Sequence, residues 1–285
     1  MGPDRLAILG VGLLGGSIGL AVKNRLKSCE VIGYAHRPET LQTALQMGAV
    51  DVGYDNAAEA VEGADLVVLC TPVLMLGPIL TKISSSLGEG AIVTDVGSTK
   101  GSIVRQAAAC IPHHATFVGS HPMAGSEKRG VQFARADLFE NALCIVTPDQ
   151  GTKGDAIDRV DRFWQLLGMH VTHLSAEDHD RAVSDISHLP HLVAAALVSM
   201  QDEESLKVIG RGFLDMTRIA AGDGGLWRDI LVDNRERLKD SIARLKLQLS
   251  EVERWLDAGD SDQLKEWLDK AAARRDILST IKPDK

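Results

Sequence analysis

Short apolar runs alternate with helical patterns along the first half of the chain. Continuous runs rich in β-branched residues are typical of strands covered on both faces, as in a parallel sheet. The helical patterns between them, such as 16–26 and 38–48, would supply the crossover connections of that sheet. The pattern therefore predicts a doubly wound α/β fold of the Rossmann type. The expected strands are 5–12, 31–35, 64–72, 90–98, 114–122 and 141–148.

The pattern changes after about Ser175, where long helical segments replace the strands. Pro190 lies inside the first of them and predicts a kink. Farther on, apolar residues recur at steps of four and three, which indicates either an apolar stripe on one helix or a heptad seam. We therefore expect a Rossmann domain at 1–174 and an all-α domain at 175–285. The residues of the stripe are Leu238, Ile242, Leu245, Leu249, Val252 and Leu256.

Composition narrows the class of protein. The 285 residues are 45% hydrophobic and 25% charged, which is ordinary for a globular protein, and the net charge is −8. An excess of acid argues against a nucleic-acid or anionic-membrane partner. The four cysteines form no C-x-x-C pair, which fits a reducing cytosol and argues against a zinc knuckle. The longest apolar stretch, 66–80, is interrupted by Pro72 and Pro78, so we expect a cytoplasmic protein without a membrane span.

A glycine-rich loop follows the first expected strand. In the sequence Gly10-Val-Gly12-Leu13-Leu14-Gly15, the first glycine allows a tight turn and the second lets the backbone approach a pyrophosphate. The third lets the helix pack closely on the strand, and the helix N-terminus then faces the phosphates. This position between strand and helix favours a dinucleotide site over a glycine-rich turn that binds nothing.

The end of the second strand bears on the choice of cofactor. NAD-preferring sites usually carry an acidic residue there, whereas this chain has Ala35, followed by His36 and Arg37. We read this as tolerance of a 2′-phosphate and hence a mild preference for NADP, with a solvated surface arginine as the alternative. The remaining residues predicted to contact the cofactor, at the ends of later strands, are Thr71, Pro72 and Asp95.

Two polar residues follow the carboxyl ends of expected strands, where ligands of open α/β sheets bind. Ser98 lies in "TDVGSTK", and it could instead be only the N-cap of a helix from Thr99. His121 lies in "GSHPMAGSE", a segment that shows no helix or strand pattern and that Pro122 would stiffen as a loop. A histidine near its ordinary pKa suits the base that takes a hydroxyl proton while a nicotinamide accepts hydride.

The helical half contributes further polar candidates. His188 and His191 in "SHLPH" share one helix face and could form a metal pair, but no carboxylate or cysteine with suitable spacing accompanies them. We therefore expect no metal. Arg218 would clamp a substrate carboxylate, with a helix-surface charge as the alternative, and Trp227 by itself is more often a core residue.

The order of motifs resembles one enzyme family. "GVGLLGGS", "TDVGSTK", "GSHPMAGSEKRG", "DHDRAVSDISHLPH" and "DMTRIA" followed by "LWRDI" resemble the prephenate/arogenate dehydrogenases of tyrosine biosynthesis over nearly the whole chain. The resemblance implies oxidative decarboxylation of prephenate or arogenate with NAD or NADP, and a homodimer formed by the helical domain. Ala35 departs from the acidic residue common in NAD-using members.

The resemblance also implies roles for individual residues. His121 would accept the hydroxyl proton, and Ser98 would orient His121 and the nicotinamide. Arg218 would bind a substrate carboxylate, and Glu127 would belong to an ionic network that gates the site. The other residues expected at the substrate are His188, His191, Asp215 and Trp227.

Two alternatives stay open on the sequence. A β-hydroxyacid dehydrogenase shares this architecture but needs a catalytic lysine on a helix with a glycine-rich approach, which the helical half does not offer. A protein that binds NADP without turnover would not need His121, Ser98 and Arg218 together. The residues do not distinguish prephenate from arogenate.

Overall fold

The computed structural model describes residues 2–126 and 128–281. The chain divides into two compact units, Met1–Arg237 and Leu238–Lys285. The first unit contains both sheets and the helices up to the start of α12, and the second contains most of α12 and all of α13. We describe the two units separately.

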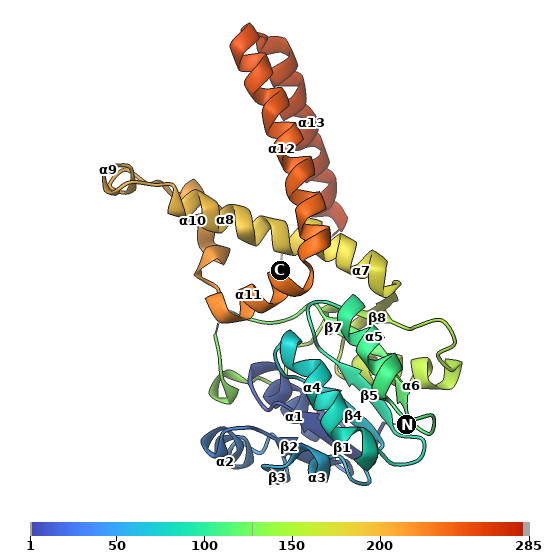
Figure 1. Ribbon diagram of the computed structural model, residues 1–285. Helices are drawn as coiled ribbons and strands as arrows, with labels where there is room; N and C mark the ends of the chain where they lie inside the picture. Colours follow the sequence, from blue (N-terminus) through green and yellow to red (C-terminus); the bar gives the residue numbers. More distant parts are fainter. Residues whose placement is uncertain (1, 127, 282–285) are drawn as a thin grey trace. The chain divides into compact units, whose positions relative to one another are not determined.

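A six-stranded parallel sheet forms the centre of the first unit (Figure 1). Its strand order is β3-β2-β1-β4-β5-β6, the order of a dinucleotide-binding Rossmann domain. The α/β fold class predicted from the alternating apolar runs is therefore confirmed. The strands are β1 (Arg5–Leu9), β2 (Glu30–Tyr34), β3 (Val52–Tyr54), β4 (Leu66–Leu69), β5 (Ile92–Asp95) and β6 (Thr116–Phe117).

Helices cover both faces of this sheet, and alternate strand residues enter two separate cores. On β1, Leu6 and Ile8 pack in the core with α1, α2 and α6, whereas Ala7 and Leu9 pack in the core with α3, α4 and α5. The strands are consequently apolar on both faces, which is why they read as unbroken apolar runs. The helices are α1 (Leu13–Arg25), α2 (Pro38–Gln46), α3 (Ala57–Ala60), α4 (Val73–Ile83), α5 (Gly101–Cys110) and α6 (Gly154–Leu166).

A second sheet of three strands, β7 (Gly119–Pro122), β8 (Leu143–Thr147) and β9 (His170–His173), corrects one prediction. The single strand expected at 114–122 is two strands in two sheets, and His121 lies in β7 rather than in a loop. His121 pairs with Ile145 of the antiparallel strand β8. This partner is distant in sequence, so no local pattern around His121 could indicate the strand.

The helical part of the first unit begins with one continuous helix. α7 (Ala176–Val183) passes through a π-helical turn, η3 (Ser184–His188), into α8 (Leu189–Ser199). Pro190 lies in the first turn of α8, so the irregularity expected at the proline takes the form of the π turn just before it. The following elements are α9 (Glu203–Leu206), α10 (Arg211–Thr217), the 3₁₀ turn η4 (Arg218–Ala221) and α11 (Gly224–Asp233).

This continuous helix, Ala176–Ser199, has the length and mean hydropathy of a membrane span by composition alone. It also carries four buried polar or ionisable side chains, including His179 and His188. Such groups are costly in lipid. Here His179 bonds to His121 of the Rossmann part, and His188 bonds to Asn234 in the same unit. We therefore interpret the helix as one packed within the protein.

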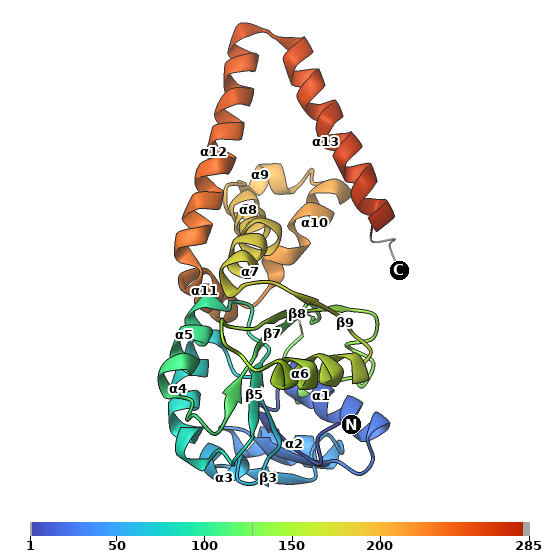
Figure 2. The same cartoon turned by 90° about the vertical axis from the view of Figure 1, so that its right-hand side faces the viewer.

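The second unit is a pair of long helices, α12 (Arg235–Ala258) and α13 (Ser261–Ile281), which diverge from the turn at Gly259 (Figure 2). Near the turn, the rings of Trp255 and Trp267 lie 6.5 Å apart. The predicted stripe from Leu238 to Leu256 lies on one helix, α12. Leu249 and Leu256 on that stripe are more than half exposed, so α12 presents an apolar face.

Candidate active site

Each glycine of the loop after β1 occupies a distinct environment. Gly10 has a φ of 110°, and a Cβ there would lie 2.8 Å from the Cys70 carbonyl. A Cβ on Gly15 would lie 2.2 Å from the Gly10 carbonyl oxygen, so only glycine allows α1 to start this close to β1. A Cβ on Gly12 would meet nothing within 4 Å. The loop is therefore tightly packed beneath and open above Gly12.

The surroundings of this opening fit a dinucleotide. α1 begins at Leu13 with Gly12 as its N-cap, so its first amides point toward the opening. Beside the loop, Thr71 Oγ1 is buried and has no hydrogen-bond partner among the described residues, as expected of a hydroxyl that binds a ligand. Pro72 next to it is exposed, and Leu14 packs on the core beneath. These features together form a cradle for a phosphate-bearing cofactor.

The residues after β2 lie at the surface. Ala35 is buried, whereas His36 and Arg37 are exposed, and Arg37 is the N-cap residue of α2. The end of β2 therefore offers a guanidinium to solvent at the place where NAD-preferring sites offer a carboxylate.

A fully buried ion pair between Asp95 and Lys100 lies below the site. The Asp95 carboxylate also accepts hydrogen bonds from the amides of Gly97 (2.9 Å) and Ser120 (3.1 Å). Asp95 thus presents no free carboxylate to a ligand, and it joins the turn that carries Ser98 to the strand that carries His121. Since α5 begins at Gly101 and its N-cap residue is Lys100, the alternative that Ser98 caps a helix from Thr99 is wrong.

His121 is the first member of a chain of three side chains. Its Nδ1 lies 2.9 Å from His179 Nε2, and His179 Nδ1 lies 2.8 Å from Asp180 Oδ1. The Asp180 carboxylate also accepts the amides of Lys100 (2.7 Å) and Gly101 (2.8 Å), so it caps α5 from α7. The hydrogen bond that the structure gives to the His121 ring therefore joins His121 to His179. Ser98 is half-buried and lies two positions before Lys100 in the sequence.

Burial determines the protonation of these groups. Burial lowers the pKa of His121 well below its usual value, and the charges of His179 and Lys100 lower it further. Burial also lowers the pKa of His179, although its hydrogen bond to Asp180 acts in the opposite direction. Burial raises the pKa of Asp180, but the hydrogen bonds from His179 and from the α5 amides outweigh this and lower it. At neutral pH both histidines are therefore neutral and Asp180 is a carboxylate.

A second group of rings lines the helical side of the site. His191 on α8 stacks on Trp227 of α11, with ring centroids 3.5 Å apart and planes 13° apart. His191 Nδ1 is buried and has no hydrogen-bond partner among the described residues. The Asn234 amide donates to His188 Nδ1 (3.1 Å) and to the Asp180 carbonyl (2.7 Å). Burial lowers the pKa of His188 to about 4.

Asp215 and Arg218, the charged residues of the "DMTR" motif, lie outside the buried networks described above. Asp215 on α10 and Arg218 at the start of η4 are both exposed, and we find no ion pair for either within residues 2–126 and 128–281. η4 packs against α8, and a Cβ on Gly222, which follows η4, would clash with the rings of His191 and Trp227. Glu127, the predicted gate, lies outside the described residues.

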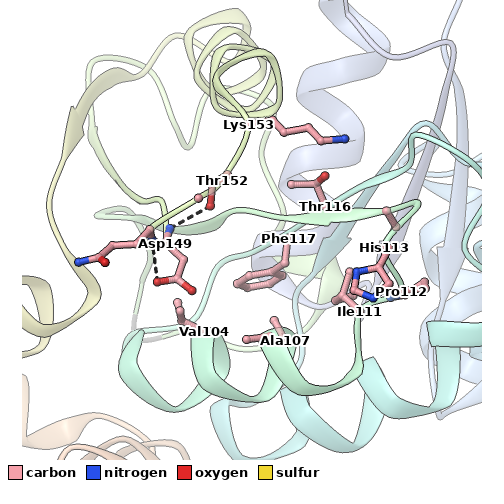
Figure 3. A pocket seen from close by; sticks show the side chains of 14 residues that line it. Val104, Ala107, Ile111, Pro112, His113, Thr116, Phe117, Asp149, Thr152 and Lys153 are labelled. Carbon is pink, nitrogen blue, oxygen red and sulfur yellow. Dashed lines mark hydrogen bonds between the residues drawn. The ribbon is translucent and has the colours of Figure 1, made fainter.

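Two further features of the described residues bear on the site: potential metal ligands and a separate cavity. No group of three or more His, Cys, Asp and Glu side chains in that part of the chain could hold a metal ion. A separate cavity of about 400 Å³ lies between α5, β6 and the segment after β8. Figure 3 shows the side chains that line it. Val104, Phe117 and Lys153 line it, and none of the described residues predicted for the site does.

Several residues of this network were missing from the sequence prediction. His179, Asp180, Asn234 and Lys100 were not singled out, although "DHD" was part of a quoted motif. His179 lies 58 positions from His121 and Asn234 lies 54 positions from Asp180. The packing of α7 on α5 and β8, and the bonds from Asn234 at the end of α11 to Asp180 and His188, bring them together.

A Rossmann nucleotide cradle, a half-buried neutral histidine at its edge and a helical wall define a class of protein, the nicotinamide-dependent dehydrogenases. Comparison with known proteins makes the assignment specific. Residues 18–173 match the family model for the prephenate dehydrogenase nucleotide-binding domain, and residues 175–270 match the prephenate dehydrogenase dimerization domain. The chain belongs to the prephenate dehydrogenase family.

Individual relatives agree with this assignment. The chain is 35% identical to prephenate dehydrogenase of Bacillus subtilis, over 96% of this chain and 76% of the relative. It is 32% identical to cyclohexadienyl dehydrogenase of Zymomonas mobilis, over 96% of both chains. A crystal structure of Aquifex aeolicus prephenate dehydrogenase with hydroxyphenyl propionate and NAD⁺ has a TM-score of 0.91 and 33% identity, and covers 98% of this chain and 99% of that one.

Proposed function

We propose that this protein catalyses the oxidative decarboxylation of prephenate or arogenate, with hydride transfer to NAD⁺ or NADP⁺. The observation that carries the proposal is His121, a neutral histidine held by His179 at the edge of a nucleotide-binding sheet in a chain of this family. The Aquifex relative, similar over nearly its whole length, binds NAD⁺ and hydroxyphenyl propionate. The products would be 4-hydroxyphenylpyruvate from prephenate or tyrosine from arogenate.

The cofactor would be held by the loop after β1. The residues that we assign to it are Gly10, Gly12, Leu13, Leu14 and Gly15, with Thr71 and Pro72 beside them. The open space above Gly12 supports this assignment, as does the Thr71 hydroxyl, which has no partner among the described residues. When bound, the nicotinamide supplies the hydride acceptor. Asp95 would act through the turn that it holds, because its own carboxylate is engaged with Lys100.

His121 would handle the hydroxyl proton. As hydride leaves the carbinol carbon of the cyclohexadienol ring, the oxygen becomes more acidic and its proton moves toward His121. The bond between the ring and its carboxylate then breaks, carbon dioxide leaves, and the ring becomes aromatic. The proton returns to the oxygen as the phenol forms, so no net proton is released. Orientation and one proton acceptor are therefore the main requirements on the protein.

The helical side would orient the substrate. Arg218 is exposed and has no ion-pair partner among the described residues, which suits the binding of a substrate carboxylate. His191 stacks on Trp227, and its buried Nδ1 has no partner in the part of the chain that the structure describes, so it would contact the substrate directly. His188 and Asp215 would complete this wall, and Ser98 would orient His121 and the nicotinamide. The gating role of Glu127 stays a prediction.

The preference for NADP is a finer proposal. Buried Ala35 and exposed Arg37 at the end of β2 support it, because a guanidinium there can pair with a 2′-phosphate. The ratio of kcat/KM for NADP⁺ over NAD⁺ decides it: we expect a ratio above one that falls below one in Arg37→Ala. A strong preference of the wild type for NAD⁺ would contradict it.

The assembly and location of the protein are proposals as well. The match of residues 175–270 to a dimerization domain and the exposed leucines of α12 support a homodimer. The two family matches meet near residue 174, which supports the predicted division into 1–174 and 175–285. A cytoplasmic location, without nucleic-acid or membrane partners, is consistent with the net charge of −8.

One assay tests the proposed function: prephenate and arogenate, each with NAD⁺ and NADP⁺, followed by cofactor absorbance and product analysis. We expect turnover of at least one cyclohexadienol, with carbon dioxide released in equal amount. A 3-hydroxyacid serves as the control substrate, because a 3-hydroxyisobutyrate dehydrogenase of Mycobacterium tuberculosis shares the fold (TM-score 0.54) at only 16% identity. Turnover of the 3-hydroxyacid alone, or of none of the three, would contradict the proposal.

A further inference from the structure

The hydrogen bonds that link His121, His179 and Asp180 determine which nitrogen of each histidine ring carries the proton. Asp180 receives three donors, because Lys100 N and His179 Nδ1 lie within 2.8 Å of Oδ1 and Gly101 N lies 2.8 Å from Oδ2. A carboxylate that receives backbone amides on both oxygens acts only as an acceptor. His179 must therefore carry its proton on Nδ1 and donate it to Asp180.

The same logic fixes the next ring. A neutral histidine has one N–H and one bare nitrogen, so His179 Nε2 is bare and must accept. The atom facing it at 2.9 Å is His121 Nδ1, which consequently carries the proton of the neutral His121 ring. His121 Nε2 is then the bare nitrogen, and it is the nitrogen that is left for a substrate hydroxyl.

We propose that His179 and Asp180 are positioning residues that hold His121 in the Nδ1–H tautomer, so that Nε2 is the proton acceptor, and that they share the positive charge formed on His121. This proposal rests on the proposed function for the identity of the proton donor. His179 contacts His121 and not the reacting atoms, so its role is exerted through His121. The helix dipole of α5 and its first amides fix the charge of Asp180.

The charge transfer balances without an added reactant. The O–H bond of the substrate breaks and its proton binds His121 Nε2, which makes the ring an imidazolium. The Nδ1 proton of His121 can then move to His179 Nε2, where the adjacent Asp180 carboxylate stabilises the cation. Both protons move back when the phenol forms, so the resting tautomers are restored after each turnover.

The surroundings of His179 explain why the carboxylate is needed. His179 is fully buried, and the ionisable groups around it are Asp95 on β5, Lys100 at the start of α5, His121 on β7, and Asp180 and His188 on its own helix. Lys100 disfavours a second cation, although Asp95 pairs with it. Asp180 is the carboxylate in direct contact with the His179 ring.

The direct test is the tautomeric state of His121 in the resting protein. We would label histidine with ¹⁵N, record long-range ¹H–¹⁵N correlations, and assign the rings with His121→Asn and His179→Phe. The expected result is a protonated Nδ1 and a bare Nε2 on both His121 and His179. A protonated Nε2 on His121 of the wild type would overturn the proposal, and this measurement needs no substrate.

Kinetics of His179 variants test the same role during turnover. His179→Phe removes the acceptor for His121 Nδ1 but leaves the bonds from the α5 amides to Asp180 in place. We expect kcat to fall about 100-fold with KM within about twofold. The amide oxygen of His179→Gln can accept the same hydrogen bond, so kcat of this variant should be at least fivefold higher than that of His179→Phe. The control is His173→Phe, which removes another histidine–carboxylate pair, His173–Asp161, and should leave kcat unchanged. Equal kcat in the two Phe variants would contradict the proposal.

The pH profile separates charge sharing from a purely structural role. Asp180→Asn keeps an oxygen acceptor for His179 but removes the charge, so a cation on the histidines is less stable and the acid limb of kcat should move about one unit lower. Asp178→Asn removes the same charge from the same helix, where Asp178 contacts exposed Arg181, and should not move it. If the acid limb of kcat did not move in Asp180→Asn, the proposal that Asp180 shares the positive charge would be wrong. If the wild type turned over neither cyclohexadienol, the proposed function would fail, while the tautomer measurement would still decide the assignment.

Discussion

The two sides of the candidate site differ in how completely their polar groups are paired. On the His121 side, His121, His179, Asp180 and the buried Asp95–Lys100 pair form one connected network. On the Arg218 side, Arg218 and Asp215 are exposed, and the part of the chain that the structure describes gives them no ion-pair partner.

The difference matches what the proposed role of each side requires. A proton acceptor must hold one geometry before the substrate arrives, and buried, fully paired groups provide that. A carboxylate clamp must keep its donors free until the ligand supplies the acceptors. Four predictions test this contrast, from the largest expected change in free energy to the smallest.

The largest effect is expected for His121→Asn. Loss of the proton acceptor should lower kcat about 10³-fold, or about 4 kcal/mol of transition-state stabilisation, with KM nearly unchanged. Steady-state rates with the substrate that the wild type prefers measure it. Unchanged turnover would remove His121 as the base and end the contrast between the two sides.

The second prediction concerns the stability of the buried network. The folded-state pKa of His188 is about 4, against 6.5 for an unperturbed histidine. Between these values the unfolded state binds the proton that the native state excludes, so the free energy of unfolding falls as the pH drops from 6.5 to 4. The loss would be at most about 3 kcal/mol.

Urea unfolding across this pH range measures the effect. His188→Gln should flatten the dependence relative to wild type, and exposed His113→Gln serves as the control. If the free energy of unfolding of His188→Gln depended on pH in the same way as that of the wild type, burial would not be keeping His188 unprotonated.

The third prediction belongs to the exposed side. Arg218→Gln should raise KM for the substrate at least tenfold, about 1.4 kcal/mol, through loss of a charge-assisted pair, while kcat changes little. Arg211→Gln removes an exposed arginine seven positions earlier and should leave KM unchanged. An equal effect of both variants would mean that only general electrostatic attraction is lost.

The smallest effect tests the wall between the two sides. A Cβ at Gly222 would lie 2.4 Å from Trp227 Nε1, so Gly222→Ala must displace the ring that stacks on His191. We expect KM to rise because the stack is displaced, but only about threefold because both rings are still present. A Cβ at Gly224 meets nothing within 4 Å, and Gly224→Ala is the matched control. Identical KM values would show that the stack does not contact the substrate.

The sequence predicted the parts of this molecule that depend on local pattern. The parallel sheet was evident because its strands are apolar on both faces. The loop around Gly12 was evident because its glycine spacing is a local motif, in which Gly10 and Gly15 meet steric requirements. The contacts of His121 were not evident. β7 pairs with a strand more than twenty positions later, and His179 and Asp180 act only because α7 packs on α5.

The capping of α5 also shows how far the two family domains depend on one another. The amides of Lys100 and Gly101 belong to the nucleotide-binding match, and Asp180, which accepts both, belongs to the dimerization match. A fragment ending at residue 174 would leave these amides without that acceptor. The two halves are therefore not interchangeable modules: any exchange of one half during evolution would have to carry the matching partner of this cap with it.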